Sequence, residues 1–277
     1  MPGINRMSAY FSRRGPGFVA AAMTLLSIQG CSDPTLQPWH TERLTAEFSV
    51  EKVDEIHSFD DYLRLEDELF AQLEEVVYAH TATGPEYALL RYSAGSAADP
   101  LRRQPNWNRS FELGVDAPTG GVLLLHGMSD SPYSLRAMAE TFKQRGYQVL
   151  GLRLPGHGTA PAGLAEVSWQ DFVAAVRIAV TSLRARLDAG QPLYLVGYSN
   201  GAALAVEYAL AVLNGEALPP VDRLVMLSPA IAVTSLARFA VWQGKLGHWL
   251  GLDKLAWNSI QPEFDPYKYN SFAVNAG

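Results

Sequence analysis

A serine set between two glycines, in the run Gly197-Tyr198-Ser199-Asn200-Gly201, is the segment whose residue types most directly suggest chemistry. An apolar run precedes it and an alanine-rich stretch follows it, so the pattern predicts a strand, a tight turn and a helix. A serine at such a turn exposes its hydroxyl, and the helix N-terminus favours the negative charge that develops during acyl transfer. The alternative is that Ser199 merely caps the helix.

Short apolar strands alternate with helices around this segment. Strands are predicted at residues 87–92, 109–115, 121–125, 147–152, 192–196 and 224–227, and helices at 58–80, 132–145, 168–187 and 200–213. Continuous apolar runs are typical of strands buried on both faces, and their alternation with helices predicts a mostly parallel sheet with helices on both faces. The expected fold class is therefore α/β.

Three segments, in this order along the chain, resemble the α/β-hydrolase superfamily: His126-Gly127-Met128, the Leu-Pro-Gly-His-Gly-Thr loop at residues 154–159, and residues 197–201. The nearer resemblance is to its monoacylglycerol-lipase and carboxylesterase-like members, the serine aminopeptidase S33-type branch, over roughly residues 119–230. The resemblance implies that Ser199 is a nucleophile in a turn formed with Gly197 and Gly201. It also implies that the backbone N–H groups of Met128 and Asn200 form an oxyanion hole.

The resemblance places the triad acid and then the histidine after the nucleophile, so His126 and His157 are interpreted as loop-shaping residues. After Ser199 the only histidine is His248, within an apolar stretch interpreted as a lid. The acids there are Glu207, Glu216, Asp222, Asp253, Glu263 and Asp265. None clearly follows a further buried strand, so we expect the acid and histidine beyond Gly277, in a C-terminally truncated chain that lacks the last strands and is nearly inactive alone. Two alternatives stay open: His248 as an unusual base, or an envelope protein without catalysis.

The N-terminus resembles a bacterial lipoprotein signal peptide over residues 1–30. It has three arginines and no acid, then an apolar stretch at residues 17–28, and it ends at Cys31, the single cysteine. Cys31 is thus the expected site of acylation, for example by palmitate; an ordinary signal peptide or short anchor with an incidental cysteine is the alternative. Ser32 in place of an aspartate favours the outer membrane, on its periplasmic face. Residues 31–57 are predicted to be a tether, and 58–277 one hydrolase domain whose cap begins near 231.

The amino-acid composition limits the classes of partner and cofactor that we expect. The chain has 277 residues, 48% of them hydrophobic, which is enough for one large domain, and a formal net charge of −6. A negative balance without a basic patch excludes nucleic acid as an expected partner. One cysteine cannot form an internal disulfide, and no ligand cluster or dinucleotide fingerprint suggests a metal or organic cofactor. We expect a lipid-anchored hydrolase of carboxylic esters; amide, peptide or thioester hydrolysis remains open.

Overall fold

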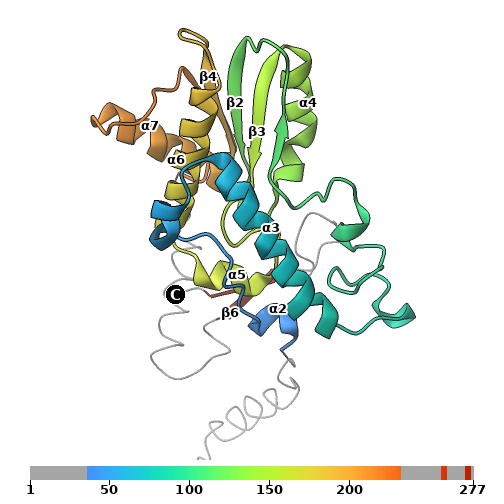
Figure 1. The fold of residues 1–277 in the computed structure, drawn as a ribbon. Helices are drawn as coiled ribbons and strands as arrows, with labels where there is room; N and C mark the ends of the chain where they lie inside the picture. The colour runs from blue at the N-terminus through green and yellow to red at the C-terminus, as the bar shows by residue number, and fades with distance from the viewer. Residues whose placement is uncertain (1–35, 232–256, 261–271, 276–277) are drawn as a thin grey trace, which may run out of the picture. The chain divides into compact units, whose positions relative to one another are not determined.

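The computed structural model describes residues 36–231, 257–260 and 272–275. Its main element is a five-stranded sheet of order β1-β3-β2-β4-β5, in which β1 pairs antiparallel with β3 and all other pairs are parallel (Figure 1). The strands are β1 (Phe111–Leu113), β2 (Gly120–Leu125), β3 (Tyr147–Leu152), β4 (Leu193–Tyr198) and β5 (Arg223–Leu227). The predicted mostly parallel α/β sheet is confirmed.

The register of the parallel strands brings their carboxyl ends to one edge of the sheet. Leu125 is the partner of Leu152 on one side and of Gly197 on the other. The loops that follow β2, β3 and β4 therefore begin at neighbouring positions. This is the edge at which open α/β sheets place their ligands.

Three of the four predicted helices begin within one residue of the predicted start, and the fourth, predicted from residue 132, begins as a 3₁₀ helix and becomes α-helical at Arg136. Ser58 accepts a hydrogen bond from the Asp61 N–H at the start of α3, and Ser168 forms a reciprocal capping box with Asp171 at the start of α6. The α-helices are α2 (Pro38–Thr41), α3 (Phe59–Val76), α4 (Arg136–Gln144), α5 (Pro161–Glu166), α6 (Trp169–Ala185) and α7 (Asn200–Leu213). The 3₁₀ helices are η1 (Val50–Glu55), η2 (Tyr78–His80), η3 (Pro85–Tyr87), η4 (Pro100–Arg102) and η5 (Pro132–Leu135).

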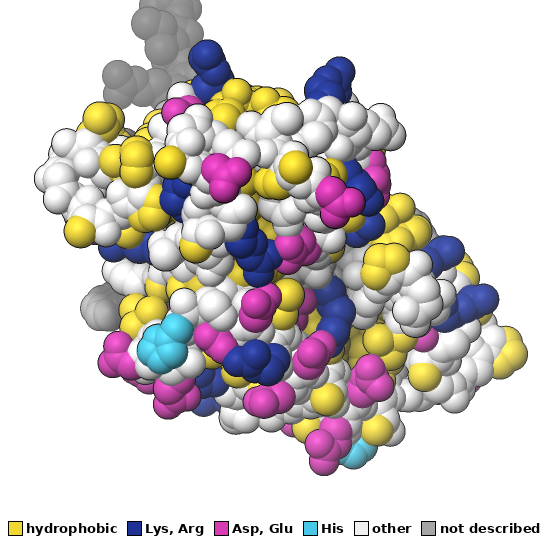
Figure 2. All heavy atoms as spheres, turned by 45° about the horizontal axis from the view of Figure 1, so that its top comes forward, with side chains coloured by type: hydrophobic (Ala, Val, Ile, Leu, Met, Phe, Trp, Pro, Cys, Tyr) yellow, Lys and Arg dark blue, Asp and Glu magenta, His cyan; other side chains and the backbone are white. Residues whose placement is uncertain are grey.

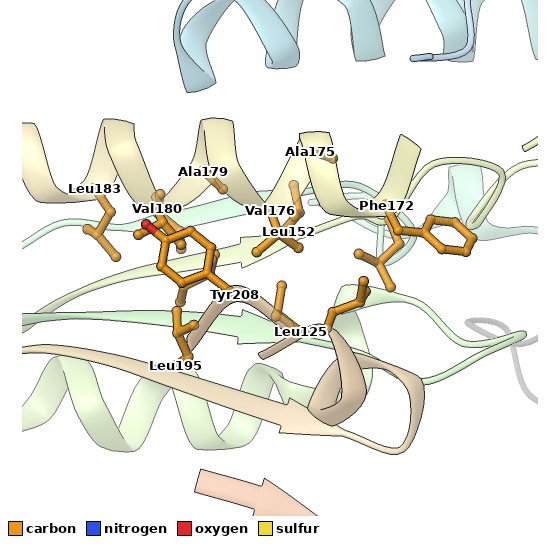
Figure 3. Packing of buried hydrophobic residues seen from close by; sticks show 14 of the residues in the cluster. Leu125, Leu152, Phe172, Ala175, Val176, Ala179, Val180, Leu183, Leu195 and Tyr208 are labelled. Carbon is orange, nitrogen blue, oxygen red and sulfur yellow. The ribbon is translucent and has the colours of Figure 1, made fainter. Parts of the chain in front are cut away.

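Alternating side chains of the buried strands fill two separate cores. On one face, Leu125, Leu152 and Leu195 pack under α6 and α7, with Val176 and Tyr208 among the residues that cover them (Figure 3). On the other face, side chains of β2 such as Val122 and Leu124 pack against α4. The central strands β2, β3 and β4 thus bury most of both faces, which explains their uninterrupted apolar runs in the sequence.

The predicted tether over residues 31–57 is wrong for its described part beyond Leu36. Trp39 is buried and its ring stacks on that of Tyr92 at 5.0 Å, and Phe48 lies in the core, where its ring is 5.3 Å from that of Tyr62 in α3. The sequence of this segment is mixed and polar, with its apolar residues far apart. Its aromatic side chains are buried by partners distant in the chain, which local composition does not reveal.

A second prediction, a strand at residues 87–92, is also wrong. The backbone there makes local hydrogen bonds, such as Leu90 N–H to the Tyr87 carbonyl at 2.9 Å, and forms turns after η3. Of its apolar residues Tyr92 is fully buried, whereas Leu89 is 54% exposed. Of the predicted cap, only strands β6 (Trp257–Ile260) and β7 (Phe272–Asn275) are described, as an antiparallel pair.

The described residues contain no helix with the length and apolar character needed to cross a bilayer. On the face of the molecule drawn in Figure 2, Lys and Arg side chains alternate with Asp and Glu side chains. That face offers no continuous basic surface for phosphate groups.

Candidate active site

Ser199 lies at the junction of β4 and α7, in a backbone conformation that few serines adopt. Its φ is +51° and its ψ is −111°, and its side chain makes no capping hydrogen bond to the helix. Its N–H donates instead to the Leu227 carbonyl of β5 at 2.9 Å. An ordinary helix cap has extended dihedrals and a bonded hydroxyl. A backbone conformation of this kind costs about 1–3 kcal/mol. It is the conformation expected where a turn exposes a serine hydroxyl to a ligand.

The glycines on either side of Ser199 permit a close approach of backbone. A Cβ at Gly201 would lie 2.6 Å from the His126 carbonyl oxygen and closer still to that of Leu125. A Cβ at Gly197 would lie 2.5 Å from the Cα of Ala202. The first contact is between α7 and the end of β2, so Gly201 lets α7 rest directly on the neighbouring strand. The second is within the turn itself.

The segment after β2 meets the turn that holds Ser199. A Cβ at Gly127 would lie 3.0 Å from the ring of Tyr198 and 3.4 Å from the Cβ of Ser199. Met128, which follows, is 48% exposed, and Asn200 opens α7 beside Ser199. The structure therefore brings together the two segments whose N–H groups the resemblance assigns to an oxyanion hole. The exposure of Met128 also argues against its being an ordinary core residue.

His126 is fully buried, and both its ring nitrogens are bonded to backbone. Nε2 lies 3.0 Å from the Leu154 N–H, which donates to it, and Nδ1 lies 2.8 Å from the Gly127 carbonyl oxygen. A carbonyl oxygen can only accept, so Nδ1 carries the proton and the ring is neutral. Burial, together with the neighbouring His157, holds the pKa of His126 well below its usual range. These bonds occupy both nitrogens, so His126 is a structural imidazole, as interpreted from the sequence.

His157 has a similar setting with one nitrogen left over. Its Nδ1 lies 2.9 Å from the Pro155 carbonyl oxygen, while Nε2 has no partner among the described residues. Its ring is edge-on to that of His126 at 5.0 Å. Burial lowers the pKa of His157 to about 4. The loop at residues 154–159 therefore contributes a buried neutral ring and no exposed base.

Arg153 is a residue that the sequence patterns did not single out. It is 1% exposed, and its guanidinium contacts both carboxylate oxygens of Glu47, at 2.9 and 3.1 Å, and Glu66 at 3.1 Å. It also donates to the His157 carbonyl at 3.0 Å. Burial raises the pKa of Glu66, an effect opposed by the charge of Arg153. Its partners, Glu47 and Glu66, lie far from it in the sequence. The sequence therefore showed only an arginine directly after a buried strand, which did not indicate a buried ion pair.

The described acids after Ser199 lie away from the carboxyl edge of the sheet or are paired elsewhere. Glu207 and Glu216 each contact Arg177, at 3.3 and 2.8 Å. Asp222 accepts from the Leu193 N–H at 2.8 Å, at the opposite end of β4. His248, Asp253, Glu263 and Asp265 lie outside the described residues, as does Cys31. Within the described ranges, then, no acid or histidine stands out as a partner of Ser199.

Apart from the turn at Ser199, the described residues form a surface groove but no metal-binding cluster. The described residues contain no group of three or more His, Cys, Asp or Glu side chains that could hold a metal ion. A surface groove of about 560 Å³ is lined by residues of η1, α6 and α7, among them Val50, Trp169 and Arg177. Neither Ser199 nor the segment after β2 lines this groove, so it is separate from the candidate active site.

Comparison with known families agrees with this arrangement. The family described as serine aminopeptidase, S33, matches residues 116–265, a stretch that runs from before β2 past β5. The matched stretch contains all three segments that meet at the carboxyl edge of the sheet.

Individual relatives match just under half of the chain. The thermostable monoacylglycerol lipase of Bacillus sp. (strain H-257) is 31% identical over 130 residues, which cover 47% of this chain and 48% of the relative. Phospholipase YtpA of Bacillus subtilis (strain 168) is 24% identical over 120 residues, 43% of this chain and 44% of the relative. The chain spans about half the length of the curated relatives it matches. A solved structure from work on the metagenome-derived lipolytic enzymes LipS and LipT is 30% identical, covers 48% of this chain and 51% of that chain, and has a TM-score of 0.43.

Proposed function

Because the chain belongs to the serine aminopeptidase S33 family, whose fold is that of the α/β hydrolases, we propose that it is a serine hydrolase of carboxylic esters with Ser199 as its nucleophile. The observation that carries the proposal is the strained turn at Ser199 between β4 and α7, with the end of β2 packed against it. A strained, uncapped serine in this position has a cost in stability that a catalytic role explains.

The proposed reaction proceeds through an acyl-enzyme. The Ser199 Oγ attacks the ester carbon, the bond between that carbon and the alcohol oxygen breaks, and the hydroxyl proton leaves with the alcohol through a general base. Water then attacks the acyl-enzyme, releases the acid and restores the serine proton. The backbone N–H groups of Met128 and Asn200 stabilise the tetrahedral oxyanion; one such donor is worth about 3 kcal/mol of barrier. The base and its orienting acid are to be sought outside the described residues.

The substrate class follows from the relatives only by analogy. A monoacylglycerol lipase and a phospholipase are both enzymes named for lipid esters, so we propose a lipid-like ester for this chain as well. The family description names an aminopeptidase, which keeps amide hydrolysis as the second candidate. Thioesters are a third substrate class for the same acyl-enzyme chemistry. Turnover of monoacylglycerols, aminoacyl amides and acyl thioesters measured side by side separates the three.

Labelling with a fluorophosphonate tests the nucleophile directly. In that reaction the bond from Ser199 Oγ to phosphorus forms as fluoride leaves, and only an activated serine reacts well. We expect one label per chain, located on Ser199 by peptide mass spectrometry, and none in Ser199→Ala with an unchanged circular dichroism spectrum. Ser228, which also has a positive φ of 44°, provides the matched control, since Ser228→Ala should label normally. The test uses the protein expressed from its complete reading frame, and the absence of any label on that protein would favour the alternative of a non-catalytic envelope protein.

The proposal includes a lipid anchor at the N-terminus. We propose that Cys31 is acylated and anchors the domain to the outer membrane on its periplasmic side. Trp39, the first buried side chain among the described residues, is the eighth residue after Cys31, so the chain between Cys31 and Trp39 can span at most about 28 Å. This spacing suits an enzyme whose substrates are delivered by a membrane.

A further inference from the structure

The hydrogen bond from His126 Nδ1 reaches a peptide group that matters for the proposed chemistry. Its acceptor is the Gly127 carbonyl, at 2.8 Å. That carbonyl and the N–H of Met128 belong to one planar peptide unit. The Met128 N–H therefore points away from the imidazole along a direction that the hydrogen bond fixes.

We infer that His126 is a positioning residue that orients and polarises the Gly127–Met128 peptide, so that the Met128 N–H is held ready as an oxyanion donor. The inference rests on the proposed function of Ser199. When a donor binds a carbonyl oxygen, it polarises the peptide group, so the N–H of the same peptide becomes a better hydrogen-bond donor. Condensed-phase estimates put this cooperative strengthening at about 10–30% per hydrogen bond. The fixed orientation of the N–H contributes as well, because an oxyanion donor is effective only when it points at the position of the oxyanion before the charge develops.

A backbone N–H on the other side of the ring fixes the tautomer of the imidazole. Its Nε2 accepts from the Leu154 N–H at 3.0 Å, which forces the ring proton onto Nδ1. Leu154 is in turn fixed by its neighbour Arg153, whose N–H donates to the Ser110 hydroxyl and whose carbonyl accepts from the Tyr62 hydroxyl, both at 2.8 Å. A continuous series of bonds thus runs from α3 through the end of β3 to the peptide beside Ser199.

A packing role and a positioning role predict different behaviour for two substitutions. In His126→Asn, the side-chain amide nitrogen occupies about the place of Nδ1 and keeps the donor to Gly127. In His126→Gln, the side-chain amide oxygen reaches about the place of Nε2 and keeps the acceptor for Leu154. Each variant loses one hydrogen bond of a buried ring, so a role in packing alone would give them similar defects.

The first measurement is the rate of fluorophosphonate labelling of Ser199 in the full-length protein. Loss of an oxyanion donor costs about 10²–10³ in rate, so loss of the bond that aims the donor should slow His126→Gln by about tenfold. We expect His126→Asn to label within about threefold of wild type, because its donor to the peptide is kept. Where substrate turnover is measurable, the His126→Gln defect should appear in kcat and leave KM unchanged. Equal rates in the two variants, whether slowed or not, would overturn the positioning role.

The second measurement does not depend on activity or on the folding of a variant. Long-range nitrogen–proton correlation spectra of wild-type histidine side chains should show, at neutral pH, a proton on Nδ1 of His126 and none on Nε2. A proton on Nε2, or a doubly protonated ring, would refute the inference while leaving Ser199 untouched. Conversely, a wild-type protein that shows the expected tautomer but never labels would overturn the proposed function, and with it this role for His126.

Discussion

The guanidinium of Arg153 and the carboxylate of Glu47 form two hydrogen bonds, of 2.9 and 3.1 Å, across 106 residues of sequence. With Glu66 they make a buried group of one cation and two carboxylates, in which Arg153 is 1% exposed. The group joins the segment before α3, α3 itself and the loop after β3. Through Leu154 and His126, that loop is connected to the turn that holds Ser199.

Removal of the cation should destabilise the fold strongly. Arg153→Met removes the cation that contacts both Glu47 and Glu66 in the interior, which we expect to cost about 3–5 kcal/mol of unfolding free energy at neutral pH. Urea denaturation measures the loss. Arg43, which pairs with Glu166 at 3.3 Å but is 75% exposed, gives the matched control, and Arg43→Met should cost less than about 1 kcal/mol. Similar losses in the two variants would contradict a special role for the buried group.

Gly201 should not tolerate even a methyl group. In Gly201→Ala, the new Cβ would lie 2.6 Å from the His126 carbonyl oxygen, a backbone atom that cannot move aside alone. We expect a loss of about 1–3 kcal/mol of unfolding free energy, together with slower labelling of Ser199 as α7 is pushed from β2. Gly114→Ala is the control, because its Cβ would first meet the Gln148 side chain at an ordinary 3.6 Å. If Gly201→Ala proved as stable as wild type, the contact between α7 and β2 would not be tight.

Acid should weaken the fold through its buried histidines. The pKa of His157 is lowered to about 4 by burial, whereas an unfolded histidine titrates near 6.5. Between these values the unfolded chain binds more protons, so the stabilisation present above pH 6.5 is lost as the pH falls towards 4. The loss amounts to about 3 kcal/mol for His157 alone, and His126 adds to it in the same direction.

Urea titrations from about pH 7 to about pH 4 test this expectation with one informative variant. His157→Asn keeps a donor for the Pro155 carbonyl but cannot titrate, so its stability should fall less steeply with acid than that of wild type. His57→Gln, which replaces an exposed histidine, is the control variant. The groups that face His157 include Arg153, Glu47 and His126. If the slopes of His157→Asn and wild type coincide, protonation of His157 is not what weakens the fold.

The membrane anchor is a prediction about Cys31. In a bacterium that processes lipoproteins, we expect the mature protein to begin at Cys31, to carry acyl chains and to fractionate with membranes. Cys31→Ser should shift it to the soluble fraction or leave it unprocessed. Mass spectrometry of the mature N-terminus decides the matter: an intact Met1, or an unmodified Cys31 at the start of the mature chain, would exclude this form of anchoring.

The sequence by itself determined the α/β architecture and the position of Ser199. Both rest on local patterns: strands buried on two faces read as continuous apolar runs, and capping residues such as Ser58 and Ser168 mark where helices begin. Gly197 is equally local, because a Cβ there would meet the backbone of the same turn at Ala202. These features need only neighbours in sequence, so one sequence suffices to predict them.

Only the tertiary structure decided what His126, Arg153 and the residues before α3 do. Trp39 and Phe48 lie in a stretch that looks like a tether, and they are buried because Tyr92, α3 and α6 supply the surfaces that cover them. Arg153 is neutralised by carboxylates 87 and 106 residues away, and the tautomer of His126 is set by a backbone N–H 28 residues further on. Burial and hydrogen-bond partners of this kind are properties of the folded chain, because they depend on distances in space that residue types and spacing do not encode.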